Sequence, residues 1–183
     1  MLDHGGWHEP KAGHFKALLG VSLIAAMPPP GGGRADVSAR LLRHAHAIVV
    51  PALSEPELRA VIEPMVGAAL RPLRRELQAM AAPLTSATLR VFHALRRELP
   101  PTPQRMLYAF TLRDLCRLVG GLQLAPSAAL KHPPQLARLW LHEATRVFGD
   151  RLVSAADREW LEEYLAAETT TTLHCRFEQV ITC

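Results

Sequence analysis

Residues 17–50, ALLGVSLIAAMPPPGGGRADVSARLLRHAHAIVV, contain the pattern that decides the fold class. Val21 to Met27 form a continuous apolar run, too short to cross a bilayer but of the length of a strand covered on both faces. A second apolar run, Ala47 to Val50, ends at Pro51. We therefore expect two buried strands, joined by a loop and a short helical segment. Such a unit is part of an α/β layer and not a complete one.

The loop between the two runs combines rigid, flexible and charged residues. Prolines 28–30 stop the first strand, Gly31, Gly32 and Gly33 permit backbone conformations that other residues avoid, and Arg34 adds a fixed positive charge. The helical segment that follows carries Arg40 and Arg43. Two interpretations are open for these two arginines. They are solvated charges on an amphipathic helix, or they reach a phosphate held by a neighbouring subunit or module.

From Ser54 onward the sequence is typical of helices. Ser54 to Glu57 have the residues of a helix N-terminus. Helices are expected at about residues 54–70, 72–80, 83–98, 104–121, 135–148 and 157–166. In the fourth of these, Thr111 and Asp114 have the spacing of a capping box, which would start the helix at Thr111 and place Arg113 in its first turn. An arginine there suits phosphate binding better than helix stability, because a helix N-terminus already favours anions.

The composition indicates a folded protein of one domain or two small ones. The chain has 183 residues, 49% of them hydrophobic, and an excess of 21 Lys and Arg over 17 Asp and Glu, or +4. This small excess does not choose among nucleic acid, acidic proteins and phosphate ligands. An odd number of widely spaced cysteines and the lack of an apolar leader predict a cytoplasmic protein. His4, His8 and His14 lack the spacing of metal ligands, so no metal site is expected.

Arginines on other predicted helices support an alternative function. Arg71, Arg74 and Arg75 form one cluster, and Arg96 and Arg97 form another. These clusters are compatible with a stand-alone helical interaction protein or a nucleic-acid-binding protein. Interleaved aromatic residues and a recognisable helix-turn-helix pattern are lacking, which favours solvated helix faces.

Five ordered blocks of the sequence resemble the dynein heavy chains, and most closely the third AAA+ module of the axonemal type. The blocks are MLDHGGW at the start of the chain, AAMPPPGGGR at 25–34, RLLRHAHAIVV at 40–50, LPPTPQRMLYAFTLRDLCRLVGGL at 99–122 and LARLWLHEATRVFGDRL at 136–152. Together they cover about residues 1–165.

The resemblance implies a fold class and a division of the chain. The fold would be an α/β remnant of an AAA+ core with two late parallel strands, followed by a mainly α-helical lid, and mostly α overall. Residues 1–52 would be the C-terminal part of the core, 53–166 the lid and 167–183 a tail that is either a stray strand or disordered.

The resemblance also implies roles for particular residues. Arg113 is the candidate for the sensor II arginine, Arg40 and Arg43 are candidates for the arginine finger acting on the neighbouring module, and Gly31 to Arg34 form the loop after the sensor I strand. The parent protein would be a minus-end-directed microtubule motor of cilia and flagella, and this region would sense nucleotide and regulate the motor ring. Expected partners are the neighbouring AAA+ modules, the dynein complex subunits and, through the parent, microtubules. A membrane or nucleic acid is not expected. The expected location is the cytoplasm, its cytoskeleton and the ciliary axoneme.

The sequence departs from the family pattern in two respects. Pro28, Ala35 and His46 stand where the family usually has Gly, Asn and Asn, which removes hydrogen-bond donors near the nucleotide. The phosphate-binding motif GxxxxGK[ST] does not occur in the 183 residues, and neither does a Walker B strand. We therefore expect ATP or ADP with Mg²⁺ to bind only in the complete module, and the isolated chain not to hydrolyse ATP.

Overall fold

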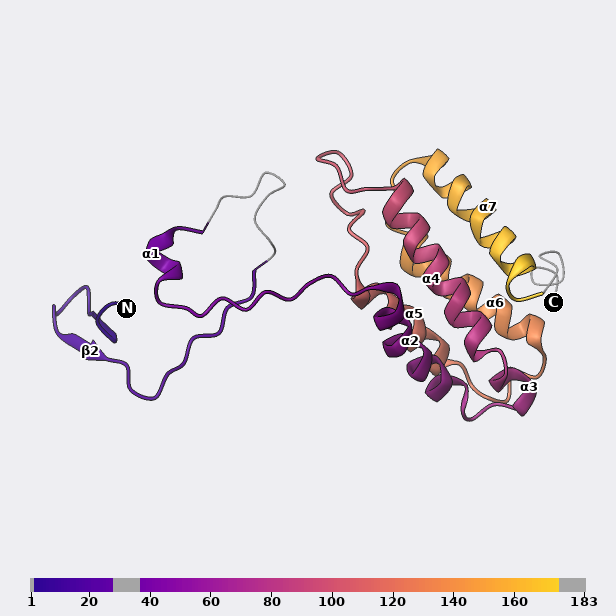
Figure 1. Ribbon diagram of the computed structural model, residues 1–183, viewed down its shortest axis with the longest axis horizontal. Coiled ribbons are helices and arrows are strands. Elements are labelled where there is room, and N and C mark those ends of the chain that lie inside the picture. Colours follow the sequence, from indigo (N-terminus) through magenta and orange to yellow (C-terminus); the bar gives the residue numbers. More distant parts are fainter. Residues whose placement is uncertain (1, 28–36, 175–183) are drawn as a thin grey trace. The chain divides into compact units, whose positions relative to one another are not determined.

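The computed structural model describes residues 2–27 and 37–174. It divides the chain into two compact units, Met1–Ala52 and Leu53–Cys183, which are considered separately below. In the described residues, the only sheet is a two-stranded antiparallel one in the first unit, and helices make up most of the regular structure (Figure 1). The predicted class, mostly α with a small β portion, is therefore confirmed.

The first unit begins with a hairpin that the sequence did not indicate. Strands β1 (Gly6–His8) and β2 (Phe15–Ala17) pair in antiparallel register, with Gly6 opposite Ala17. Gly13, in the connection, has a φ of +68°, in the left-handed region that glycine adopts without a steric penalty. At Gly6 a side chain would overlap the carbonyl oxygen of Lys16, so the close approach of the two strands requires glycine.

The two strands expected at residues 21–27 and 47–50 are not formed, which corrects the prediction of two parallel buried strands. Both segments lack regular structure, and their side chains are exposed, with Ile24 94% and Val49 87% exposed. A strand needs a neighbour for its N–H and C=O groups and a layer that covers its apolar face. The described part of the first unit supplies neither to these runs.

The second unit is a helical bundle that contains the hydrophobic core. Its helices are α2 (Glu55–Leu70), α3 (Arg75–Gln78), α4 (Ala81–Glu98), α5 (Leu112–Leu124), α6 (Pro133–Ala144), the π-helical turn η1 (Thr145–Gly149) and α7 (Ala155–Thr171). Helix α2 packs against α4 and α5, helix α6 against α5, and helix α7 against α4 (Figure 1). The largest fully buried side chains are Trp140, Tyr108, Phe92 and Phe148.

Local signals place several helix starts correctly. Ser54 and Glu57 form a capping box at the start of α2, and Thr111 and Asp114 form one at the start of α5, as the sequence predicts. Pro64 does not end α2, which continues to Leu70. Of the range 104–121, only the part from Leu112 is helical, in agreement with the start that the capping box predicts, and the helix expected over 72–80 is reduced to the single turn α3.

Helix α7 continues five residues past its predicted end at Ala166. The added residues include a run of threonines, whose branched side chains lower helix propensity. In the structure Thr169 is fully buried and its hydroxyl donates to the carbonyl of Leu165 at 2.7 Å, and Thr170 donates to that of Ala166 at 3.1 Å. Burial and these hydrogen bonds outweigh the low propensity. Within the described ranges, no helix is both long and apolar enough to cross a membrane.

Helix α1 (Ala39–Leu42) completes the first unit. It is a single turn that begins after Ser38 and has no buried residue. It carries Arg40 and is followed directly by Arg43 and His44. These three side chains therefore owe their positions to polar contacts and not to a packed helix face.

Candidate functional site

Arg113 lies in the first turn of α5, where the sequence predicts it. Its side chain is exposed, and within residues 2–27 and 37–174 its guanidinium makes no ion pair or hydrogen bond. The N–H groups at the start of a helix carry a partial positive charge, so an anion at this end would meet both that charge and a free guanidinium. The arrangement can bind a phosphate group.

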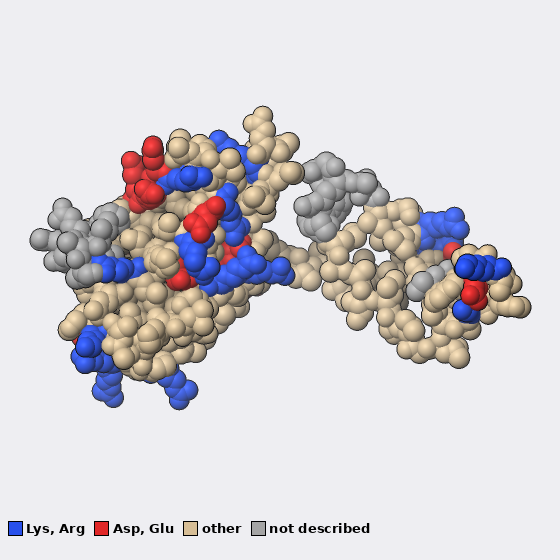
Figure 2. Space-filling view, turned by 180° about the vertical axis from the view of Figure 1, so that it is seen from behind, with Lys and Arg blue, Asp and Glu red and all other residues tan. Residues whose placement is uncertain are grey.

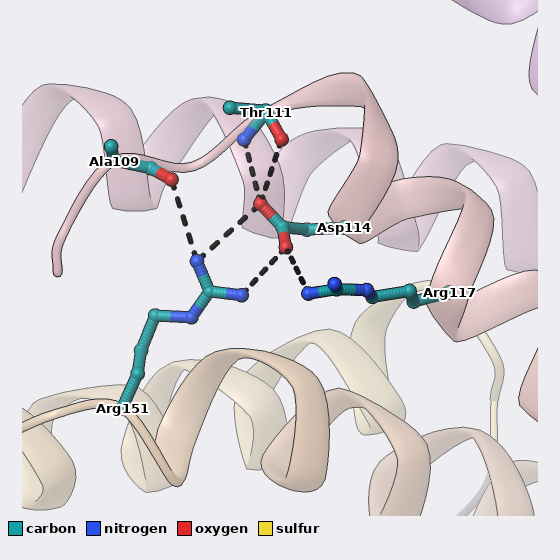
Figure 3. Close-up of polar contacts among 5 residues, drawn as sticks. All are labelled: Ala109, Thr111, Asp114, Arg117 and Arg151. Atoms are coloured by element: carbon teal, nitrogen blue, oxygen red, sulfur yellow. Dashed lines mark hydrogen bonds and ion pairs between the residues drawn. The ribbon is translucent and has the colours of Figure 1, made fainter.

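The residue next to Arg113 is in the opposite situation. Asp114 is 2% exposed, and its carboxylate accepts a hydrogen bond from the backbone N–H of Thr111 at 2.8 Å and one from the Thr111 hydroxyl at 3.1 Å. A guanidinium nitrogen of Arg151 donates to it at 2.6 Å, and Arg117 lies 3.5 Å away (Figure 3). Adjacent positions on a helix point in different directions, so Asp114 is buried while Arg113 faces solvent.

These donors keep Asp114 ionised. Burial by itself raises the pKa of the Asp114 carboxyl, but the hydrogen bonds from Arg151 and from Thr111, together with the positive charge of Arg151, outweigh it. The resulting pKa lies below the ordinary value for aspartate. A charged Asp114 is therefore part of the folded protein at neutral pH.

Arg151 joins two other groups to this carboxylate. A guanidinium nitrogen of Arg151 donates to the carbonyl oxygen of Ala109 at 3.4 Å (Figure 3). The guanidinium also lies 5.3 Å from the centroid of the Phe110 ring. Arg151 follows the π-helical turn η1, and its side chain is only 20% exposed. The sequence did not point to Arg151, because nothing in the linear spacing shows that residue 151 meets residue 114.

A second polar network lies beside the first. The hydroxyl of Tyr108 donates to the Asp157 carboxylate at 2.8 Å and accepts from the backbone N–H of Val153 at 2.9 Å. Arg105 forms an ion pair with Asp157 at 3.3 Å. Tyr108 and Asp157 are both buried, so the segment before α5 is attached to the start of α7 at a second point.

Arg40 and Arg43 come together around one acid in the first unit. The carboxylate of Asp3 pairs with Arg43, lies 2.8 Å from His44 and lies 3.9 Å from Arg40. The hydrogen bond from Arg43 lowers the pKa of Asp3 below its ordinary value. Arg40 remains 82% exposed and Arg43 57% exposed, so both guanidinium groups are accessible to a further anion. The predicted loop Gly31 to Arg34 lies outside the described residues.

Other groups of polar side chains in the described residues do not form a site. His142 and Glu143 approach to 3.9 Å, but Glu143 is buried and accepts a hydrogen bond from Arg146 Nε at 3.0 Å. No group of three or more His, Cys, Asp or Glu side chains in the described ranges could hold a metal ion.

The arginine clusters of the helical unit do not indicate a nucleic-acid surface. Figure 2 shows that, on one face of this unit, basic and acidic side chains lie next to one another in several places. Arg97 pairs with Glu98 at 2.7 Å, and Arg90 approaches Glu168 at 4.0 Å. A continuous basic stripe is typical of nucleic-acid binding, and interspersed acids weaken such a field. The alternative function is not favoured.

Comparison with known families covers nearly the whole chain. The family described as "Dynein heavy chain, ATPase lid domain" matches residues 59–158, and "P-loop containing dynein motor region" matches residues 1–53. The boundary between the two matches falls close to the division between the two structural units.

Individual curated proteins match as well. The chain is 34% identical to dynein axonemal heavy chain 1 of Homo sapiens over 98% of its own length, and 35% identical to the Rattus norvegicus protein of the same name over 90%. It is 32% identical to the dynein-1-beta heavy chain of the flagellar inner arm I1 complex of Chlamydomonas reinhardtii over 96%. The matched stretch is 5% of the human protein and 4% of each of the other two.

Proposed function

The chain belongs to the dynein heavy chain family, and from this premise we propose that it senses nucleotide within the third AAA+ module of an axonemal heavy chain. Residues 1–52 would be the C-terminal part of the module's α/β core, 53–166 its lid and 167–183 a tail. The parent protein would be a microtubule motor of cilia and flagella. The third module would regulate that motor by responding to ATP or ADP with Mg²⁺.

The observation that carries this proposal is the state of Arg113. Its neighbours Asp114 and Arg117 are committed to contacts within the lid, whereas the Arg113 guanidinium has no partner in the described residues and lies at a helix N-terminus. The position fits a sensor II arginine that meets a phosphate when the lid closes. Mg²⁺ would enter with the nucleotide in the complete module, bound through the phosphates and one or two carboxylates.

Arg40 and Arg43 fit the second predicted role, that of an arginine finger. In the first unit they share Asp3, which carries a single negative charge, whereas a nucleotide phosphate carries more charge and several acceptor oxygens. Either arginine could exchange Asp3 for the phosphate of a neighbouring module. Gly31 to Arg34 would be the loop that follows the sensor I strand.

The exposed apolar runs at 21–27 and 47–50 support the assignment of the first unit to a larger core. The side chains of Ile24, Ile48 and Val49 are 86–94% exposed. Burying an apolar side chain of this size contributes roughly 1.5–3 kcal/mol to stability, so this exposure is unfavourable. We propose that these runs become strands when further strands of the module pair with them. The neighbouring AAA+ modules, and through the parent the other dynein subunits and microtubules, would be the partners.

The experiment is a substitution of Arg113 in a dynein heavy chain that carries this segment. Arg113→Ala is expected to weaken Mg²⁺–ATP binding at the third module by about tenfold or more, since a hydrogen bond to a charged group contributes roughly 1.5–3 kcal/mol. Arg74→Ala is the matched control, because Arg74 is an exposed arginine of the same unit whose guanidinium makes no ion pair or hydrogen bond within the described residues. Equal ATP affinity in the Arg113→Ala and unchanged proteins would contradict the proposal.

A further inference from the structure

Arg151 holds together parts of the helical unit that are distant in the sequence. Its guanidinium donates to the carboxylate of Asp114 and to the carbonyl oxygen of Ala109 (Figure 3). It also lies against the ring of Phe110. The three partners are residues of the segment that leads into α5 and of the first turn of that helix. Arg151 itself follows η1, 37 residues after Asp114.

The segment that leads into α5 has no regular structure of its own, although Tyr108 and Phe110 are buried and Tyr108 binds Asp157. Residues 104–110 form no helix or strand, and Met106 and Leu107 are 77% and 67% exposed. The first turn of any helix also has N–H groups without intrahelical partners, so it frays unless a cap holds it. Here the N-cap is Thr111 and its capping-box partner is Asp114, whose principal charged donor is Arg151.

Arg113 belongs to that same turn, between Leu112 and Asp114. The backbone of Arg113 is therefore held by the capping box of Thr111 and Asp114. Through Asp114 it is also held by Arg151. A flexible exposed arginine loses side-chain and backbone entropy when it binds a phosphate, and a backbone that is already ordered reduces this loss.

We propose that Arg151 is a positioning residue for Arg113. The guanidinium of Arg151, bound to Asp114 and Ala109, orders the first turn of α5. The backbone of Arg113 is therefore already fixed when its side chain meets the nucleotide phosphate. This inference rests on the proposed nucleotide-sensing role of Arg113. Arg151 does not touch the phosphate in this arrangement, because its guanidinium is occupied by contacts within the lid.

The test is a double-mutant cycle on Mg²⁺–ATP binding in a dynein heavy chain that carries this segment. Arg151→Met should weaken binding about threefold to tenfold. The double variant Arg113→Ala with Arg151→Met should bind no more weakly than Arg113→Ala alone, because a positioning residue has nothing to position once Arg113 is gone. Arg151→Lys should restore only part of the loss, since lysine keeps the charge but not the planar fork. Arg74→Met is the control for loss of one positive charge and should bind ATP normally.

Each other outcome overturns a specific claim. Additive losses in the double variant would show that Arg151 acts independently of Arg113. Normal binding by Arg151→Met, with weakened binding by Arg113→Ala, would refute the positioning role and leave the sensor role in place. Normal binding by Arg113→Ala would refute the proposed function and this inference with it.

A second measurement covers the case in which Arg151→Met reduces folding. Amide hydrogen exchange of residues 111–114 should be accelerated about threefold to tenfold in Arg151→Lys, while exchange in α4 stays unchanged. Unchanged exchange of residues 111–114 would show that Arg151 does not order the turn and would overturn the inference without any nucleotide measurement.

Discussion

Asp114 links the stability of the lid to the presentation of Arg113. Its carboxylate accepts hydrogen bonds from Thr111 and Arg151 and lies near Arg117, although it is only 2% exposed. A buried charge of this kind is tolerated because its hydrogen bonds are satisfied, and losing one partner leaves an uncompensated polar group. Asp114, which orders the turn that carries Arg113, thus also affects the stability of the fold.

We predict that Asp114→Asn destabilises the chain by about 1–3 kcal/mol at pH 7. The pKa of Asp114 is lower in the folded protein than its ordinary value, so the carboxylate stabilises the folded state above about pH 4. That contribution is lost as the pH falls through the still lower folded pKa. Urea unfolding at pH 7, 5, 4 and 3 should show the difference between the unchanged protein and Asp114→Asn shrinking below about pH 4. A difference that is constant with pH would contradict this prediction.

Gly121 is a second residue whose identity is determined by its surroundings. A Cβ at this position would overlap the Glu143 side chain, which is buried and paired with Arg146. The neighbouring Gly120 has open space, with nothing within 4 Å of an added Cβ. The two adjacent glycines therefore provide a matched pair.

We predict opposite effects of alanine at these two glycines. Gly121→Ala should destabilise the chain by about 1–3 kcal/mol, because Glu143 must move away from Arg146. Gly120→Ala should be neutral or stabilise by up to about 1 kcal/mol, because alanine is the better helix former. The midpoint of thermal unfolding of each variant checks both signs. Destabilisation of similar size at the two positions would mean that the contact with Glu143 is not what requires glycine.

Among the helices, α5 and α7 are connected through the segment that precedes α5. Tyr108 binds Asp157 in the first turn of α7 and the N–H of Val153 just before it, while Arg151 binds Asp114 in the first turn of α5. These contacts therefore attach residues 105–114 to residues 151–157 at two points. A displacement of the first turn of α5 on phosphate binding would act directly on the start of α7.

We predict that Tyr108→Phe loosens this connection. Removing the hydroxyl leaves Arg105 as the partner of the Asp157 carboxylate, and it leaves the Val153 N–H without its acceptor. The free energy of unfolding should fall by about 1–2 kcal/mol. Faster amide exchange at Val153 is the local measurement. Tyr164→Phe is the control, since the hydroxyl of Tyr164 has no hydrogen bond in the described part of the chain. An equal effect of both substitutions would contradict the proposed connection.

The two units of the molecule differ in how they are held together. The buried core is made of residues between Leu58 and Leu173, all within the helical unit. The described part of the first unit instead relies on a short hairpin and the polar cluster around Asp3. The helical unit thus contains what a stable fold requires by itself.

We predict that residues 53–183 fold without the first unit. Their urea unfolding should be cooperative, with a free energy within about 1 kcal/mol of that of the full chain, since truncation removes no residue of the core. Circular dichroism should retain the helical signal of α2 and α4 to α7. Loss of the cooperative transition would show that the first unit supplies contacts that the helical core needs.

Part of this fold and site could be predicted because the interactions are local. The capping pairs Ser54 with Glu57 and Thr111 with Asp114 lie three residues apart, so the sequence alone indicates where α2 and α5 begin and that Arg113 lies in a first turn. The apolar stripe of α6, with Leu136, Trp140 and Ala144 buried, follows from helical periodicity in the same way.

What remained undetermined by the sequence depends on residues that are distant along the chain. Arg151 meets Asp114 across 37 residues and Tyr108 meets Asp157 across 49, and no spacing rule indicates such pairs. The apolar runs at 21–27 and 47–50 have the composition of strands but remain exposed, since a strand forms only where neighbours accept its hydrogen bonds. The threonines at the end of α7 show the reverse, because burial of Thr169 overrides its low helix propensity. The sequence by itself determined where α2 and α5 begin and that Arg113 lies in a first turn. Only the tertiary structure decided which charges pair, because pairing depends on burial and on distances that folding creates.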